Sequence, residues 1–261
     1  MLIELNNRFY QEQGSSFADT RGAPWHGWKR CLEELDKAAA LSGKSTYSVL
    51  DLACGNRRFE DFLRSSLPEL KINYHGIDNS EEMMAIRRGQ NLDLLALLIQ
   101  GQEQGSHYLS QIDTPDADLT VSFGFMHHIP GQKLRKQLLD SMIAHTKPGG
   151  FIIVSFWQFL KSPELTDKAQ LTHAQALAEL GTTPPYDSPA HLQAALDAGD
   201  YFLGWQGRAG AYRYCHSFTP EEIDELIAQV AGKAQLVARF DADGRTRNLN
   251  CYAIFRRTEN S

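Results

Sequence analysis

Two acidic residues near the ends of two apolar segments have the spacing of a site for a ribose-containing cofactor. Asp51 lies in the apolar run 47–54, which Gly55 follows, and Asp78 comes directly after the apolar run 72–77. In open α/β sheets, an acid about 20 residues beyond the glycine turn hydrogen-bonds the ribose hydroxyls of the ligand. We therefore predict that both acids contact a cofactor, although each alone also fits a solvated acid in a turn.

The glycine pattern after the first apolar run disfavours a dinucleotide. A dinucleotide site uses the pattern Gly-x-Gly-x-x-Gly so that the pyrophosphate can approach the backbone, and only Gly55 of those glycines is present. S-adenosylmethionine has no phosphate and carries a sulfonium cation, which suits an acid such as Asp51. The 2′-phosphate of NADP would be repelled by Asp78. The pattern therefore favours S-adenosylmethionine over NAD and NADP.

Five cationic or titratable side chains are candidates for contact with the substrate. Arg21 precedes a predicted helix, where a guanidinium can clamp a carboxylate of the cofactor or of an acidic substrate. His127 and His128 follow the third apolar segment at its carboxyl end, where a substrate is expected. Arg213 and His216 are three residues apart, so an extended strand cannot turn both toward one ligand without a bend. We predict a catalytic role for all five, and a structural role is the alternative for each.

The elements that must position these residues alternate between strand and helix. Apolar segments typical of strands cover residues 47–54, 72–77, 117–123 and 151–157. Helical patterns lie between them, over residues 58–65, after the capping residue Ser80, and over residues 132–145. Two alternating segments near the C-terminus, 235–240 and 249–255, are separated by an Asp-Gly turn. This order predicts an α/β fold with a doubly wound, mostly parallel sheet and a terminal antiparallel hairpin.

Two regions lie outside this alternation. Residues 1–46 are predicted to form an N-terminal helical cap, with an amphipathic helix over residues 25–41. Residues 158–211 are rich in Ala, Leu, Gly and Pro and are predicted to be a mainly helical insertion over the substrate side of the sheet. Residues 91–112 fit neither pattern. We expect residues 1–261 to form a single domain.

Composition narrows the class of protein. The net charge of −6 and the pI of about 5.8 argue mildly against a protein that holds nucleic acid by bulk electrostatics. The four cysteines are far apart in sequence, so we expect no metal site of the zinc-knuckle type. No apolar run approaches the ~20 residues that span a bilayer, and the N-terminus lacks an apolar signal segment. We therefore expect a cytoplasmic protein with no membrane partner.

Four longer segments resemble the motifs of class I S-adenosylmethionine-dependent methyltransferases. They are DLACGNRRF, HGIDNSEEMM, ADLTVSFGFMHHIP and HTKPGGFIIVSFW, within residues 51–157. The resemblance implies a Rossmann-like fold and S-adenosylmethionine as the cofactor. The implied cofactor contacts are Arg21, Trp25, Asp51, Ala53, Gly55, Asn56, Asp78, Asn79 and Phe123.

The chain departs from this family at two glycines and at one acid. Ala53 and Arg57 stand where the family usually has glycine. We expect the side chain of Arg57 to lie near the cofactor and to shift the loop or weaken binding. The family's third motif, an acid beside the adenine, is not evident in the segment LLIQGQEQGS, residues 97–106.

Five shorter segments are similar to the methyltransferases that esterify carboxymethyluridine at the wobble position of tRNA. They are FADTRGAPW, GFMHHIP, IIVSFW, RYCHSFTPEEIDELI and NLNCYAIF, and they occur in the same order along the chain. The resemblance implies tRNA as the substrate. It also implies a small zinc-binding activator protein as a partner, because members of this group often work with one.

Two other functions fit the same residues. A small-molecule O- or N-methyltransferase agrees with the acidic pI and with a lid formed by residues 158–211. A carboxylate is already a nucleophile, whereas an amine or hydroxyl substrate needs a general base such as His127 or His128. A non-catalytic binding protein on a methyltransferase fold agrees with the lost glycines at Ala53 and Arg57 and with the missing third motif.

Overall fold

The computed structural model describes residues 1–19, 22–79, 89–104, 111–112 and 114–259, and its centre is a mostly parallel sheet. Within these residues, seven strands pair in the order β3-β2-β1-β4-β5-β9-β8. The strands are β1 Thr46–Leu52, β2 Lys71–Asp78, β3 Gln90–Asn91, β4 Ala117–Ser122, β5 Thr146–Trp157, β8 Ala234–Ala242 and β9 Asn250–Arg257. The first five pair in parallel, and β9 pairs antiparallel with both β5 and β8. The predicted parallel sheet with a terminal antiparallel hairpin is confirmed.

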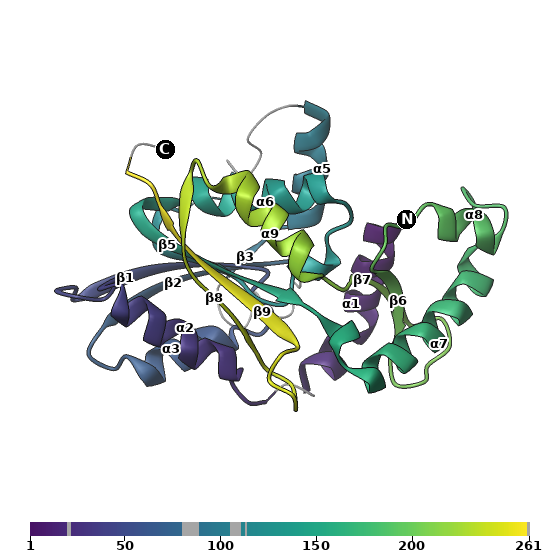
Figure 1. Cartoon of the computed structure of the whole chain (residues 1–261), viewed down its shortest axis with the longest axis horizontal. Helices are drawn as coiled ribbons and strands as arrows, with labels where there is room; N and C mark the ends of the chain where they lie inside the picture. Colours follow the sequence, from purple (N-terminus) through teal and green to yellow (C-terminus); the bar gives the residue numbers. More distant parts are fainter. Residues whose placement is uncertain (20–21, 80–88, 105–110, 113, 260–261) are drawn as a thin grey trace.

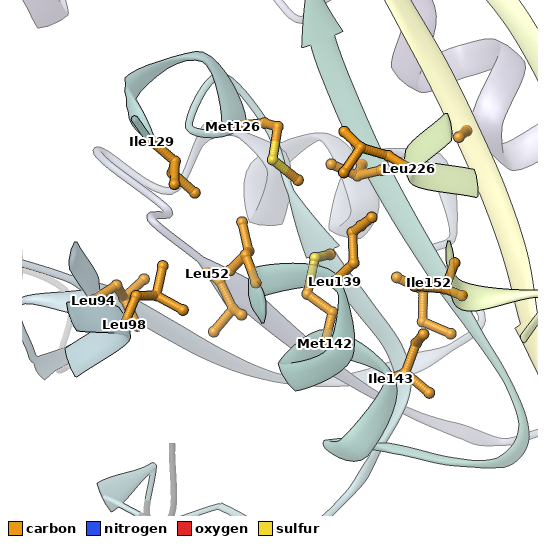
Figure 2. Packing of buried hydrophobic residues seen from close by; sticks show 14 of the residues in the cluster. Leu52, Leu94, Leu98, Met126, Ile129, Leu139, Met142, Ile143, Ile152 and Leu226 are labelled. Atoms are coloured by element: carbon orange, nitrogen blue, oxygen red, sulfur yellow. The ribbon is translucent and has the colours of Figure 1, made fainter. Parts of the chain in front are cut away.

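Helices cover both faces of this sheet (Figure 1). One face carries α2 His26–Lys37 and α3 Arg58–Ser66; the other carries α5 Leu94–Gln104, α6 Gln132–Ala144 and α9 Pro220–Val230. Successive side chains of a strand point to opposite faces, so Val49 packs toward α2 while Leu50 and Leu52 pack toward α6. Figure 2 shows Leu52 facing Leu139 and Met142 of α6. Burial on both faces explains the nearly continuous apolar runs of the parallel strands.

A smaller lobe stands beside the sheet (Figure 1). It contains α7 Pro163–Leu180, α8 Pro189–Ala194 and a two-stranded antiparallel sheet of β6 Asp200–Gly204 and β7 Tyr212–His216. The N-terminal helix α1, Leu2–Asp19, packs against β7 through a cluster that includes Leu5, Phe202 and Tyr214. The region predicted as a mainly helical insertion thus also holds a strand, β6. Its pattern was hidden because β6 pairs with a segment outside the region.

Asp243 joins the terminal hairpin to α2. Its carboxylate accepts hydrogen bonds from the backbone amide of Gly27 at 3.0 Å, from the side chain of Asn250 at 2.9 Å and from the Tyr252 hydroxyl at 2.5 Å. The ring of Tyr252 occupies the space beside Gly27, where a Cβ atom would lie 2.2 Å from ring carbon Cε2. Only glycine at position 27 permits this approach, and α2 thereby lies against β9.

No helix in the described ranges is both long enough and apolar enough to cross a membrane.

We expect Gly27→Ala to lower the free energy of unfolding by about 1–3 kcal/mol. The added methyl group collides with the fully buried Tyr252 ring, and this cost exceeds the gain in helix propensity of about 1 kcal/mol. Urea denaturation followed by circular dichroism measures the change. The matched control is Gly232→Ala, whose Cβ would meet nothing within 4 Å. Equal stability of the two variants would contradict the packing described here.

Candidate functional site

A pocket lies where the carboxyl ends of β1, β2 and β4 meet, and α1 forms its opposite wall. Eight of the nine residues predicted to contact the cofactor line this pocket, namely Trp25, Asp51, Ala53, Gly55, Asn56, Asp78, Asn79 and Phe123. The ninth, Arg21, lies outside the described residues. The parallel sheet therefore brings residues from position 25 to position 123 to a single cavity.

The loop between β1 and α3 has a backbone conformation that glycine favours at three positions. Ala53, Gly55 and Arg57 have φ angles of 62°, 52° and 56°, in the left-handed region. The amide of Gly55 donates a hydrogen bond to Asp78 at 2.8 Å. Because the left-handed conformation costs a non-glycine residue roughly 1 kcal/mol or more, the surrounding contacts must hold this loop in place. The hydrogen bond to Asp78 is one of these contacts.

The expectation that the Arg57 side chain points toward the cofactor is wrong. Arg57 is only 5% exposed and lies behind the loop, where its Nε is 2.9 Å from the Glu60 carboxylate. Its guanidinium carbon lies 5.0 Å from the centre of the Tyr74 ring. Gly76 leaves the space for this arrangement, since a Cβ atom there would lie 3.3 Å from Arg57 Nε. The replacement of glycine by Arg57 therefore places no side chain in the pocket.

Asp51 is the most deeply buried of the acids in the pocket. It is 2% exposed and accepts a short hydrogen bond from the Tyr74 hydroxyl. Removal from water raises the pKa of Asp51 to about 7, since desolvation outweighs the opposing effect of the hydrogen bond from Tyr74. The negative charge of Asp78 raises the pKa of Asp51 further in the same direction. Asp51 therefore changes its charge near neutral pH.

An acid that sequence reasoning missed also lines the pocket. Asp93 follows β3, and one carboxylate oxygen accepts a hydrogen bond from the amide of Ala96 at 3.0 Å, which caps α5. The other oxygen accepts a hydrogen bond from Asn7 at 2.8 Å. Asp93 lies upstream of residues 97–106, the segment in which the family's third motif is not evident. The useful signal was an Asp directly before an apolar helix, because Asp is a preferred N-cap.

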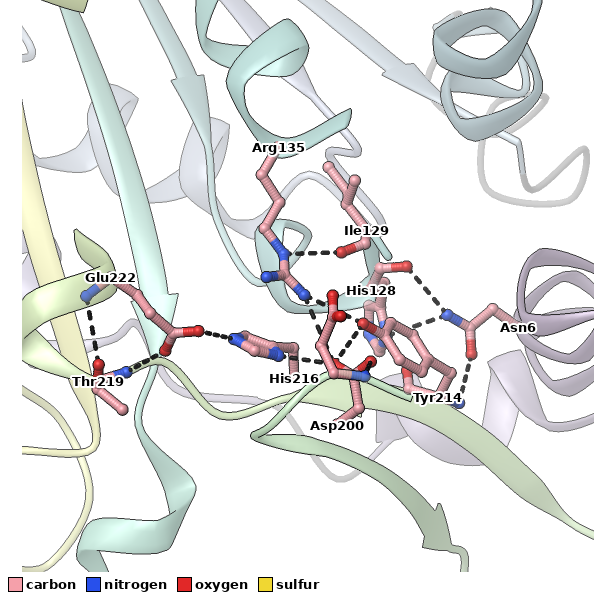
Figure 3. A network of polar contacts seen from close by, with 10 residues as sticks. Asn6, His128, Ile129, Arg135, Asp200, Tyr214, His216, Thr219 and Glu222 are labelled. Atoms are coloured by element: carbon pink, nitrogen blue, oxygen red, sulfur yellow. Dashed lines mark hydrogen bonds and ion pairs between the residues drawn. The ribbon is translucent and has the colours of Figure 1, made fainter. Parts of the chain in front are cut away.

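The N-terminal helix contributes Asn6, Asn7, Tyr10 and Gly14 to the pocket, and none of them was predicted. The Asn6 side chain accepts a hydrogen bond from the amide of Tyr214 at 2.7 Å and donates one to the carbonyl of His128 at 3.4 Å. Figure 3 shows Asn6 between these two partners. The signal in the sequence was the spacing of Leu5 and Phe9, four residues apart and both buried, among the polar residues of this segment.

His128 lines the pocket, but its ring is already engaged. Its Nδ1 lies 2.9 Å from the carbonyl oxygen of Tyr214, which can only accept, so Nδ1 carries the proton. In the neutral ring, Nε2 then accepts from the Tyr10 hydroxyl at 2.7 Å. His127 does not line the pocket and packs against Trp157, with ring centres 4.9 Å apart. Of the two histidines, only His128 reaches the cavity, in contact with Tyr10.

The structure does not bring Arg213 and His216 to one ligand. Arg213 is buried, with its guanidinium 5.0 Å from the Phe9 ring centre and 5.6 Å from that of Trp205. The ring nitrogens of His216 lie 2.7 Å from Asp200 and 3.1 Å from Glu222 (Figure 3). Both residues belong to the extended strand β7, so their side chains point to opposite faces. His216 joins β6, β7 and α9 and does not line the pocket.

Among the described residues, His127, His128 and Cys215 have potential metal ligand atoms within 4.8 Å of one another. His128 Nδ1 lies 3.7 Å from the sulfur of Cys215. Binding an ion through His128 would break one of the hydrogen bonds that its ring makes with Tyr214 and Tyr10. We therefore assign no metal to this cluster.

The fold and the pocket define a class I methyltransferase, and comparison with known proteins identifies the family. A family model described as a methyltransferase domain matches residues 23–231. The chain therefore belongs to this methyltransferase family. The resemblance to methyltransferases that the sequence predicted is confirmed at the level of the family.

One relative is similar in sequence to most of the chain. It is the tRNA (carboxymethyluridine(34)-5-O)-methyltransferase of Arabidopsis thaliana, 23% identical over 189 residues. The match covers 70% of this chain and 40% of the relative, so the chain spans less than half of that protein's length.

Two solved structures share the fold. A methyltransferase from Methanosarcina mazei has a TM-score of 0.53 at 14% identity, over 82% of this chain and 94% of the other. CalS10, an amino pentose methyltransferase from Micromonospora echinaspora, has a TM-score of 0.51 at 15% identity, over 94% of this chain and 96% of the other. At these identities the likeness concerns the fold alone.

The residues of the pocket fit the donor groups of S-adenosylmethionine. Asp78 would accept hydrogen bonds from the ribose hydroxyls, and Asp93 would accept one from the adenine amino group. The buried carboxylate of Asp51 would face the cationic methionine end. When bound, the cofactor would supply an activated methyl group to a substrate beside this pocket.

We expect the affinity for S-adenosylmethionine to rise with pH and to level off above about pH 7. A raised pKa means that Asp51 is neutral below about pH 7 and charged above it, and a cationic ligand favours the charged form. At pH 6 the affinity should be about tenfold below its plateau. Isothermal titration calorimetry measures this dependence of the affinity on pH. The control is Asp51→Asn, which lacks the carboxyl group, so that any remaining pH dependence comes from titration of the ligand. The same pH dependence in Asp51→Asn would refute the assignment to Asp51.

Proposed function

We propose that the chain methylates the carboxylate of carboxymethyluridine at the wobble position of tRNA, with S-adenosylmethionine as the donor. The observation that carries the proposal is that the segments resembling the tRNA methyltransferases contact one another beside His128, which lines the pocket. His127 packs on Trp157, His128 contacts the carbonyl of Tyr214, and Trp157 pairs with Asn250 across β5 and β9. These residues come from four of the five segments that resemble the tRNA methyltransferases. The similarity to the Arabidopsis thaliana relative supports the same substrate.

The chemistry of His128 favours a carboxylate over an amine or a hydroxyl. An amine or hydroxyl nucleophile must lose a proton to a general base, whereas a carboxylate needs only alignment with the methyl group. In the neutral ring of His128, the nitrogen that would act as the base already accepts the hydrogen bond from Tyr10. The site therefore suits a nucleophile that needs no deprotonation.

Arg213, which does not line the described pocket, is the candidate for holding an acidic substrate beside it. Its guanidinium lies among the rings of Phe9 and Trp205, and burial between apolar rings strengthens the attraction of a cation for an incoming carboxylate. Arg213 is on β7, the strand whose Tyr214 carbonyl contacts His128. We include in the proposal a small zinc-binding activator protein, as the resemblance to the tRNA methyltransferases implies.

A small-molecule methyltransferase is the second candidate. The acidic net charge of −6 favours it, because a protein that binds the phosphates of tRNA usually carries basic residues in excess. The pocket wall formed by α1 also gives the site an enclosed shape that suits a small substrate.

We expect transfer of a radioactive methyl group to tRNA that carries unesterified carboxymethyluridine. The product should be a base-labile ester at the wobble uridine, formed in the presence of a small zinc-binding activator. The control is Asp78→Ala, which should lose cofactor binding and activity together because Asp78 anchors the Gly55 loop. Labelling of metabolites with no label in tRNA would refute the tRNA proposal and favour the second candidate.

A further inference from the structure

The charged side chains around the pocket match the cofactor group by group, with one exception. Three carboxylates line the described part of the pocket, from Asp51, Asp78 and Asp93, and each suits a donor or cationic group of S-adenosylmethionine. The carboxylate of the methionine end requires a cation. Among the described lining residues, Arg58 is the only lysine or arginine.

Arg58 is presented to the pocket by the loop that carries the other cofactor contacts. It is the first residue of α3, three positions beyond Gly55. Its neighbour Arg57 turns behind the loop to Glu60, whereas Arg58 lies on the pocket side. The two adjacent arginines thus have different surroundings, and only Arg58 faces the cavity.

The guanidinium of Arg58 is held in place without being neutralised. It lies 5.9 Å from the ring centre of Trp25 and 5.6 Å from that of Trp28, and its Nη1 donates to the carbonyl of Ala23 at 3.0 Å. Arg58 forms no ion pair with any carboxylate of the described residues. Partial burial lowers the pKa of Arg58, which reflects the cost of keeping this charge out of water.

We propose that Arg58 binds the carboxylate of the methionine end of S-adenosylmethionine. A guanidinium offers two parallel hydrogen bonds to a carboxylate. Cation–π contacts with Trp25 and Trp28 and the hydrogen bond to Ala23 restrict its orientation before the ligand arrives, so less side-chain freedom is lost on binding. This assignment concerns the cofactor and does not depend on tRNA as the substrate.

The competing explanation is that Arg58 only holds Trp25 against the pocket. Trp25 lies close above Gly124, where a Cβ atom would be 3.2 Å from the indole. Loss of Arg58 would then loosen Trp25 and weaken the binding of every ligand of the pocket equally. The two explanations differ in whether the effect depends on the carboxylate of the ligand.

The test compares S-adenosylmethionine with its decarboxylated form, which lacks only that carboxylate. Calorimetric titration of the chain of residues 1–261 measures both affinities for wild type, Arg58→Met and Arg58→Lys. We expect Arg58→Met to weaken binding of S-adenosylmethionine about 10- to 100-fold and to leave binding of the decarboxylated form within about twofold. Arg58→Lys should recover part of the loss, since it keeps the charge but not the two-pronged geometry.

The matched control is Arg64→Met, on the same helix, whose arginine pairs with Glu60 and does not line the pocket. It should change neither affinity. If Arg58→Met lowers the affinity for both ligands equally and leaves the melting temperature of the apo protein unchanged, the proposal is overturned in favour of a role through Trp25. Unchanged affinities would overturn it in favour of a cation elsewhere, such as Arg21. If the wild type binds neither ligand, the cofactor assignment itself fails, whereas absent tRNA methylation would leave this result standing.

Discussion

Parallel pairing of β1 with β2 and β4 is the constraint on which the site depends. It places the ends of these strands at one edge, so that Asp51, Asp78 and Phe123 line a single cavity. The hydrogen bond from Gly55 to Asp78 then fixes the loop between β1 and α3 against the neighbouring strand. The same pairing buries Asp51, and its position in the sheet accounts for a carboxyl that titrates near neutral pH.

The loop shows how a methyltransferase pocket can survive the loss of two glycines. Ala53 adopts the left-handed conformation with only a methyl group to accommodate. Arg57 adopts it too, and its side chain fits behind the loop, beside Glu60 and Tyr74, in the space left by Gly76. The loss of these two glycines suggested a decayed binding site, but the loop accommodates both replacements without closing the pocket. This finding weakens the case for a non-catalytic protein.

Helix α1 supplies the wall opposite the sheet, and β7 of the smaller lobe packs against α1. Asn6 and Tyr10 of α1 bind His128, and the carbonyl of Tyr214 on β7 completes the contacts of that ring. His216 serves the same lobe in another way, because it links Asp200 to the capping box glutamate of α9. The wall opposite the sheet is thus built from a segment that the cofactor motifs do not include.

The sequence alone determined the alternation of strands and helices, the terminal hairpin, and the acids Asp51 and Asp78, because each depends on local periodicity or on the spacing to a turn. Only the tertiary structure decided which side chains meet. Asp93 and α1 reach the pocket through packing between segments that are far apart, and the Asn7 side chain bonds to a residue 86 positions away. The opposite directions of Arg57 and Arg58 were likewise hidden, because their identical side chains differ only in the partners that the fold provides.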